Sequence, residues 1–414
     1  MLNLTVTTDQ YLLDHDKCNA MSRLARSTNK IIIVFSGTSR VAQQSPIQYS
    51  SESTPALALH SWIANLTTHA WQSSNTPPRR VNLPPRTPIT TSPQIPITAL
   101  AMDPDAEVAF EFVPVIRQYK SGRVERLAPV RPVPPSVDAA TSVASKDVTI
   151  DAATGLWARL YLPDLSAQPS SCVGAGEDED EDGQRRLPIV LYFHGGGLVV
   201  GTAADAPEHA FLNRLAARAG ALAVSVEYRL APEHPVPACY DDAWAALLWA
   251  TSTSSATDAW LRNHGDAARV SVLGFSAGGN VAHNLTLRAG SEPDPLLARG
   301  ARVEGMALVH PYFLSPSCDT ATGKDWVRGK LAELWAFACG GATTGVLVCL
   351  AEDALVAEGL AYYDALLASG WAASDAELLD SRPADHEFHF REPDSAKAVI
   401  LMDRLVALIT GGYQ

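Results

Sequence analysis

The feature that most constrains the fold of this chain is the run from Val270 to Asn280, Val-Ser-Val-Leu-Gly-Phe-Ser-Ala-Gly-Gly-Asn. An apolar segment leads into a turn with one serine, and a helix-forming sequence follows. Gly274, Ser276 and Gly278 fit the G-x-S-x-G pattern, in which a sharp strand-to-helix turn exposes a nucleophilic serine. Glycines on both sides let strand and helix approach without a side-chain clash. The spacing predicts a strand, a turn and a helix, with Ser276 as the nucleophile.

A second motif lies upstream, where the apolar run Leu187–Phe193 ends in His194-Gly195-Gly196-Gly197. In lipase-type hydrolases a His-Gly-Gly-Gly sequence supplies backbone N–H groups to the oxyanion of the reaction. Either motif alone is also compatible with an ordinary glycine-rich turn. Both together, in this order and each directly after a buried strand, favour ester hydrolysis by a serine.

Between the two motifs lies Tyr228-Arg229-Leu230-Ala231-Pro232-Glu233-His234-Pro235. With this segment the chain resembles the plant carboxylesterases of the hormone-sensitive-lipase-like branch of α/β-hydrolases. That branch also contains the gibberellin receptor and the hydroxyisoflavanone dehydratases. The resemblance runs from about Met102 to the C-terminus. It implies an α/β-hydrolase fold with an eight-stranded, mostly parallel sheet, helices on both faces and an N-terminal lid at about residues 102–145.

The acid of a catalytic triad follows the serine in this fold, after a late strand. Val346–Leu350 is an apolar run of that kind, and Glu352 and Asp353 come directly after it. The resemblance to the family's acid motif points to Asp353, with Glu352 as the alternative. An acid after a strand is also often only a helix cap.

The base is expected in a loop before the last helix. The family pattern of an acid, His, any residue, Phe and His matches Asp385–His389. This places His386 as the general base and His389 as a packing residue, with His389 as the alternative base. His310, which follows another apparent strand, is interpreted as structural.

These residues predict one mechanism. Ser276 attacks the ester carbonyl, His386 transfers its proton to the leaving alcohol, and Asp353 orients His386. The oxyanion is expected to bind the N–H groups of Gly195, Gly196 and Ala277. The residues expected to support the two motifs are His194, Gly197, Gly274 and Gly278.

Members of the family with other functions differ from the esterases at the positions of the catalytic triad. The resemblance implies that gibberellin receptors lose the triad histidine and that the dehydratases carry Thr in place of the serine. This chain has both Ser276 and His386, which favours a serine carboxylesterase that acts on small or medium acyl esters. The alternative is a receptor-like, hormone-binding member without turnover, or an inactive pseudoenzyme. Phe275 stands where the family often has Asp, so an altered pocket is expected rather than lost chemistry.

Composition limits the partners. The net charge of −13 argues against nucleic-acid binding. The acidic run Glu177–Asp182 is typical of a solvated loop rather than a metal site. The 6 cysteines form no C-x-x-C pair, which indicates a reducing compartment and no zinc. No run of apolar residues is long enough to span a membrane. We therefore expect a cytoplasmic enzyme with a small-molecule ester substrate, no metal and no cofactor; the oligomeric state stays open.

Two parts of the chain do not fit the family pattern. Residues 1–101 are rich in Ser, Thr and Pro, and we expect them to be a disordered extension, either a gene-model artefact or a transit leader to the plastid. Residues 102–414 are expected to form the catalytic domain. Near Gly345 the chain lacks a segment with Asp-Pro and Asn-Pro motifs that the resemblance implies, so we expect lower stability or an open site.

Hydrophobic periodicity predicts where the helices and strands lie. A short amphipathic helix is expected at residues 107–112 and a hairpin turn at residues 119–124. The main strands are expected at residues 148–150, 156–162, 189–193, 222–227, 270–274, 306–309, 346–350 and 376–379. The main helices are expected at residues 206–219, 240–250, 278–288, 355–369 and 396–409.

Overall fold

The structure of the chain is a computed structural model. It describes residues 30–35, 107–166, 186–254, 257–290, 296, 300–313, 325–340, 362–364, 366–367 and 374–412. The chain divides into two compact units, one made of residues 1–45 and 129–414 and the other of residues 46–128. Each unit is described by itself.

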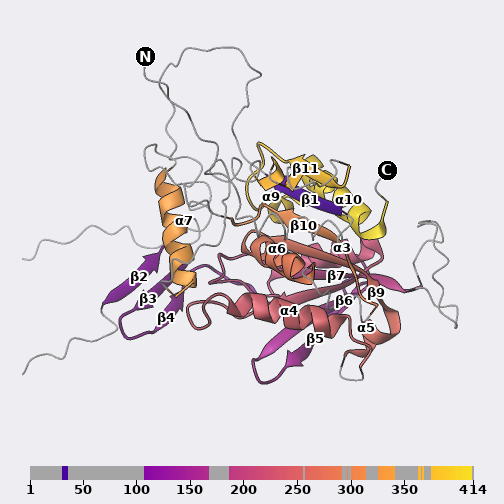
Figure 1. Cartoon of the computed structure of the whole chain (residues 1–414), viewed down its shortest axis with the longest axis horizontal. Coiled ribbons are helices and arrows are strands. Elements are labelled where there is room, and N and C mark those ends of the chain that lie inside the picture. Colours follow the sequence, from indigo (N-terminus) through magenta and orange to yellow (C-terminus); the bar gives the residue numbers. More distant parts are fainter. Residues whose placement is uncertain are drawn as a thin grey trace, which may run out of the picture. The chain divides into compact units, whose positions relative to one another are not determined.

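The larger unit is built on an eight-stranded sheet with the strand order β11-β1-β10-β9-β7-β8-β6-β5 (Figure 1). The strands from β11 to β8 run parallel, and β6 and β5 pair antiparallel at one edge. Their bounds are β1 Lys30–Phe35, β5 Ala144–Asp151, β6 Leu156–Leu162, β7 Leu187–Phe193, β8 Leu222–Glu227, β9 Gly265–Phe275, β10 Val303–Val309 and β11 Ala376–Asp380. The mostly parallel sheet expected from the sequence is therefore confirmed.

Helices cover both faces of this sheet. A core cluster joins the apolar sides of α3 and α10 to one face, and α4 packs with α6 on the other (Figure 1). The helices are α3 Ala206–Ala219, α4 Ala238–Ala250, α5 Ala259–His264, α6 Ala277–Ala289, α7 Asp325–Ala338, α9 Phe388–Arg391 and α10 Ala396–Thr410. None of the described helices is long and apolar enough to cross a membrane.

The strand β1 was not expected. Lys30–Phe35 lies inside the sheet, with Ile31 opposite Met306 of β10 and Ala376 of β11. The structure therefore differs over these residues from the extension expected for residues 1–101. The physical reason is a continuous apolar run, Ile-Ile-Ile-Val, which suits a parallel strand buried on both faces. The expected strand Val346–Leu350 lies outside the described residues, as does the region around Gly345.

The smaller unit contains an antiparallel sheet of three strands, β2 Val108–Phe112, β3 Ile116–Tyr119 and β4 Val124–Arg126. The short helix expected at residues 107–112 is wrong. Val-Ala-Phe-Glu-Phe is too short for its periodicity to separate helix from strand, and β3 supplies the hydrogen bonds of a hairpin. The turn expected at residues 119–124 is confirmed, with Gly122 at a φ of 89°.

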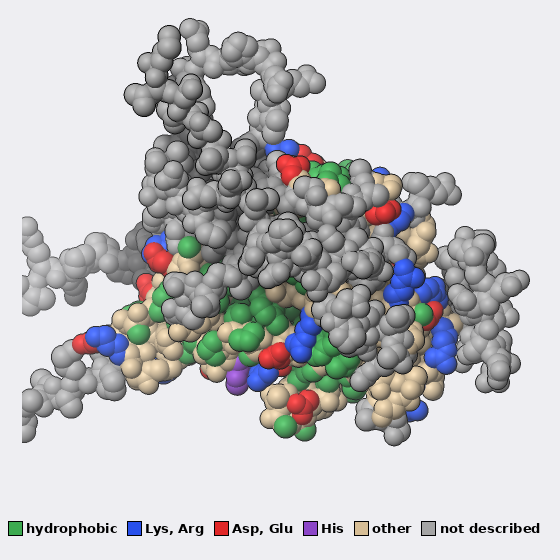
Figure 2. Space-filling model, viewed as in Figure 1, with side chains coloured by type: hydrophobic (Ala, Val, Ile, Leu, Met, Phe, Trp, Pro, Cys, Tyr) green, Lys and Arg blue, Asp and Glu red, His purple; other side chains and the backbone are tan. Residues whose placement is uncertain are grey.

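The described surface carries both signs of charge. Acidic and basic side chains are interspersed in Figure 2. Ion pairs such as Arg214–Asp394 and Arg218–Asp403 connect α3 to the C-terminal region. Exposed pairs of this kind contribute little stability each, on the order of 0–1 kcal/mol. The buried apolar cluster is therefore the main support of the sheet.

Candidate functional site

Ser276 occupies a strained turn between a strand and a helix. β9 ends at Phe275 and α6 begins at Ala277, so the serine is the one residue between them. Its φ of 53° and ψ of −116° are values that a residue with a side chain seldom adopts. Its side chain makes no capping hydrogen bond to α6. The turn thus places a hydroxyl that does not cap α6 at the end of a buried strand, as a nucleophile requires.

The two flanking glycines are sterically required. A Cβ on Gly274 would lie 2.0 Å from the carbonyl oxygen of Gly278. A Cβ on Gly278 would lie 2.0 Å from the carbonyl oxygen of Phe193 at the end of β7. The sequence can fold in this way because both positions lack a side chain, and the close approach brings the end of β7 against α6.

The His-Gly-Gly-Gly loop follows β7 and passes beside the serine. A Cβ on Gly195 would lie 3.3 Å from the Cβ of Ser276. Gly196 has a φ of 117°, and a Cβ there would lie 2.1 Å from the carbonyl oxygen of Val200. Ala277 is the first residue of α6, so its N–H is one of the unpaired donors at a helix start. The structure therefore brings the two motifs together, with backbone next to the candidate nucleophile.

His194 stabilises the His-Gly-Gly-Gly loop through a ring stack and a hydrogen bond. Its ring is buried and stacks on the ring of Tyr228, with 4.3 Å between centroids. Its Nδ1 lies 2.7 Å from the carbonyl oxygen of Gly195 and is the donor of that contact, since a carbonyl can only accept. Burial lowers the pKa of His194, so the ring stays neutral at neutral pH. The Tyr228 hydroxyl donates to the carbonyl of His194 at 2.8 Å.

His386 lies beside the serine turn. Its ring centroid is 4.9 Å from that of Phe275, the residue before Ser276. Its Nδ1 is buried and has no hydrogen-bond partner among the residues that the structure describes. Burial, then the neighbouring His310 and Arg391, hold the pKa of His386 well below its ordinary value. The imidazole is therefore neutral at neutral pH, which is the state that a general base needs.

The position of the triad acid is not described. Asp353 and the alternative Glu352 both lie outside the described residues. Asp385, next to His386 in the sequence, is engaged elsewhere: its carboxylate accepts from the Glu387 N–H at 2.8 Å and from Arg391 at 2.9 Å. The unpaired Nδ1 of His386 is the atom that a triad acid would bind.

Two further histidines surround Phe275. The Nδ1 of His310 donates to the carbonyl oxygen of His386 at 2.7 Å, and the two rings lie 5.3 Å apart. His389 is buried, with its ring centroid 4.9 Å from that of Phe275 and 4.0 Å from that of Phe390. His310 was expected to be structural, and its contact with the base loop was not predicted. The signal for it was its place directly after β10, beside the end of β9.

A buried carboxyl that the sequence analysis missed lies behind the glycine loop. Glu208 in the first turn of α3 is 7% exposed, and the Tyr192 hydroxyl donates to its Oε2. Burial raises the pKa of Glu208 to about 8. In the sequence it looks like an ordinary acid near a helix start, because its partner Tyr192 is on β7.

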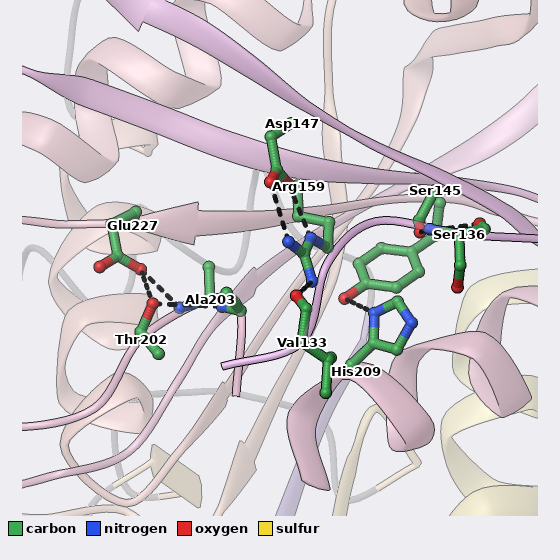
Figure 3. A network of polar contacts seen from close by, with 11 residues as sticks. Val133, Ser136, Ser145, Asp147, Arg159, Thr202, Ala203, His209 and Glu227 are labelled. Atoms are coloured by element: carbon green, nitrogen blue, oxygen red, sulfur yellow. Dashed lines mark hydrogen bonds and ion pairs between the residues drawn. The ribbon is translucent and has the colours of Figure 1, made fainter. Parts of the chain in front are cut away.

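Polar contacts anchor the segment that leads from the glycine loop to α3. The Glu227 carboxylate accepts from the hydroxyl of Thr202 at 2.8 Å and from the N–H of Ala203 (Figure 3). Arg159 donates to Asp147 at 2.6 and 2.8 Å and to the carbonyl of Val133 at 2.8 Å (Figure 3). The loop is thereby fixed to β8, and the chain before β5 is fixed to β6.

No metal site is formed within the described part of the chain, where no three His, Cys, Asp or Glu side chains are placed to hold an ion. The chemistry of the described residues is that of a serine, a neutral imidazole and backbone donors. This set is suited to acyl transfer.

Comparisons with known proteins give similarities at three levels. Residues 190–345 match the family described as alpha/beta hydrolase fold. The chain is 35% identical over 338 residues to "Probable carboxylesterase 13" of Arabidopsis thaliana, across 74% of this chain and 99% of that protein. It is 37% identical over 333 residues to "Tuliposide A-converting enzyme b2, amyloplastic" of Tulipa gesneriana, across 74% and 81%. The crystal structure of esterase LipW from Mycobacterium marinum is similar at a TM-score of 0.51 and 25% identity, across 67% of this chain and 84% of that one.

Proposed function

Because this chain belongs to the plant carboxylesterases of the hormone-sensitive-lipase-like branch of α/β-hydrolases and is a carboxylic ester hydrolase, we propose that Ser276 is its nucleophile and His386 its general base. The observation that carries the proposal is the strained turn at Ser276, with the glycine loop on one side and the His386 ring against Phe275. The substrates are small or medium acyl esters, and no cofactor takes part.

Catalysis begins when the Oγ of Ser276 attacks the ester carbonyl and His386 accepts its proton at Nε2. The negative charge that develops on the carbonyl oxygen is stabilised by backbone N–H groups beside the serine. His386 then passes the proton to the leaving alcohol. Water, activated by the same imidazole, hydrolyses the acyl-enzyme and restores Ser276.

Asp353 is proposed to accept a hydrogen bond from the Nδ1–H of His386, which keeps Nε2 free to take the proton. Gly195, Gly196 and Ala277 form the proposed oxyanion hole.

Two finer proposals concern substrate choice and location. Residues 102–145 are proposed as a lid that sets the size of the acyl group. The enzyme is proposed to be cytoplasmic, with the plastid as the alternative, since the tulip relative is named amyloplastic.

A fluorophosphonate ester tests the nucleophile directly, because it forms a stable covalent bond to an activated serine. Incubation of the full chain, followed by peptide mass spectrometry, should place one phosphonyl group on Ser276. The Ser276→Ala protein should stay unlabelled. Labelling of another serine in both proteins would refute the assignment.

The pH dependence of kcat/KM tests the general base. His386 must be neutral to accept a proton, and burial holds its pKa below the ordinary value. Activity is lost as pH falls through that pKa, so the acid limb should lie below the value of an ordinary histidine, which is about 6.5. The measurement is kcat/KM for an uncharged ester from pH 4.5 to 8. An acid limb at pH 7 or above would contradict a buried, neutral base.

A further inference from the structure

We propose that His310 is a positioning residue that holds the general base beside the nucleophile. Its side chain fixes the backbone of His386, and its own segment is hydrogen-bonded to the backbone of Ser276. The inference rests on the proposed function and adds to it a residue outside the triad and outside both glycine-containing motifs. In this scheme His310 contacts no reacting atom and acts through the main chain of the two residues that react.

The segment after β10 is bonded to both backbone polar groups of Ser276. The N–H of Ser276 donates to the carbonyl of Val309 at 2.9 Å, and the N–H of Tyr312 donates to the carbonyl of Ser276 at 2.8 Å. The side-chain amide of Asn280, on α6, also donates to the carbonyl of Tyr312 at 3.1 Å. His310 lies between Val309 and Tyr312 in the sequence, so its backbone is fixed relative to the turn that presents the nucleophile.

The backbone of His310 is held in an unusual conformation. Its φ is 48°, in the left-handed region that few residues with a side chain adopt, and Ser276 has a φ of 53°. The N–H of His310 donates to the carbonyl of Val34 in β1 at 2.9 Å. Strained residues persist where their surroundings fix them, and they cluster at functional sites. Here the two residues follow the adjacent strands β9 and β10.

The side chain of His310 reaches the loop that carries the base. Its Nδ1 lies 2.7 Å from the carbonyl oxygen of His386 and is the donor, since a carbonyl can only accept. Its Nε2 is buried and has no partner among the residues that the structure describes, so in this part of the chain the ring makes one hydrogen bond. Burial lowers the pKa of His310 to about 4, so the ring is neutral at neutral pH and adds no charge beside the base.

Two contacts together restrain the imidazole of His386. Its carbonyl is bound by His310, which holds the backbone from which the side chain projects, and its ring lies 4.9 Å from that of Phe275. Phe275 directly precedes Ser276, so both contacts hold the base relative to the nucleophile. Proton transfer needs the two atoms within hydrogen-bond reach, and a displacement of about 1 Å can cost on the order of 100-fold in rate. Releasing the carbonyl of His386 should therefore slow turnover without weakening substrate binding.

Two substitutions separate positioning from packing. His310→Leu keeps an apolar side chain in the buried site and removes the donor, and we expect kcat to fall roughly 10- to 100-fold with KM changed less than about 3-fold. In His310→Asn the amide nitrogen is the same number of bonds from the backbone as Nδ1, and asparagine tolerates a positive φ. This variant should keep kcat within about 5-fold of the parent, because it retains the donor.

The experiment measures kcat and KM of the full chain with p-nitrophenyl butyrate, at a temperature well below the lowest melting temperature of the set. His209→Leu is the matched control, because the Nδ1 of His209 on α3 also contacts a single group, the Tyr161 hydroxyl at 3.1 Å, on β6. It should lower the melting temperature and leave kcat unchanged. If His310→Leu does not fold, His310→Gln decides in its place. Its amide nitrogen stands one bond further from the backbone, so kcat should fall as expected for His310→Leu.

The inference would be overturned by an unchanged kcat in His310→Leu, by an equal loss in His310→Asn, or by an equal loss in the control. A rise in KM alone would also overturn it, since it would place His310 in substrate binding. Ser276→Ala and His386→Ala are measured beside them. If either retained the turnover of the parent, the proposed function itself would fail, whereas a loss in both without one in His310→Leu would refute the positioning role alone.

Discussion

Replacing Ser276 by alanine should reduce kcat for p-nitrophenyl acetate and p-nitrophenyl butyrate by roughly 10⁴-fold or more while the fold is retained. The reason is that the turn offers one hydroxyl beside the glycine loop and the His386 ring, and alanine cannot form the acyl-enzyme. The measurement is turnover of the purified full chain, with circular dichroism to compare the folded state of parent and variant.

The strain at position 276 makes the control important. A φ of 53° is unfavourable for alanine as well, so the turn stays equally strained and the melting temperature should change little. Ser271→Ala is the matched control, because Ser271 is a buried serine on the same strand. It should keep the activity of the parent. A Ser276→Ala protein with more than about one tenth of the parent turnover would show that another group is the nucleophile, and an inactive parent would favour the receptor or pseudoenzyme alternative.

The elements with a local sequence pattern were predictable from the sequence alone. The β9–α6 turn was predictable because Gly274 and Gly278 have no substitute where backbone oxygens come within 2.0 Å of a Cβ. α3 was predictable from apolar periodicity with Asp205 before it and Gly220 after it. β2 was not, because a five-residue run fits both periods and its partner strand decides the outcome.

In the candidate site, too, local motifs were predictable and contacts between distant elements were not. Its motif residues stand out in the sequence, and the structure places Ser276, the glycine loop and His386 near one another. Glu208 does not stand out, since it is buried beside Tyr192, which lies on a different element and donates a hydrogen bond to it. The contact of His310 with the His386 carbonyl likewise depends on two loops that only the folded sheet brings together.

Removing β1 should destabilise the catalytic unit as a whole. Ile31, Ile32, Ile33 and Val34 are 0–1% exposed, and burial of four such side chains stabilises by about 6–12 kcal/mol at roughly 1.5–3 kcal/mol each. That is comparable with the whole stability of a typical protein, about 5–15 kcal/mol. The strand also accepts a hydrogen bond from the His310 N–H at the Val34 carbonyl, and it pairs with β11, which leads to the His386 loop. Stability and turnover should therefore be lost together.

The test compares two truncated chains, residues 30–414 and residues 36–414, which differ only by the six residues of β1. The longer one should melt close to the full chain and hydrolyse p-nitrophenyl butyrate. The shorter one should melt about 10 °C lower or more, or fail to fold, because the inner edges of β10 and β11 lose their partner and the apolar surface beside them meets water. If residues 36–414 melted within about 2 °C of residues 30–414 and kept full turnover, β1 would be dispensable. The catalytic domain would then be complete without it, as the sequence alone suggested for residues 102–414.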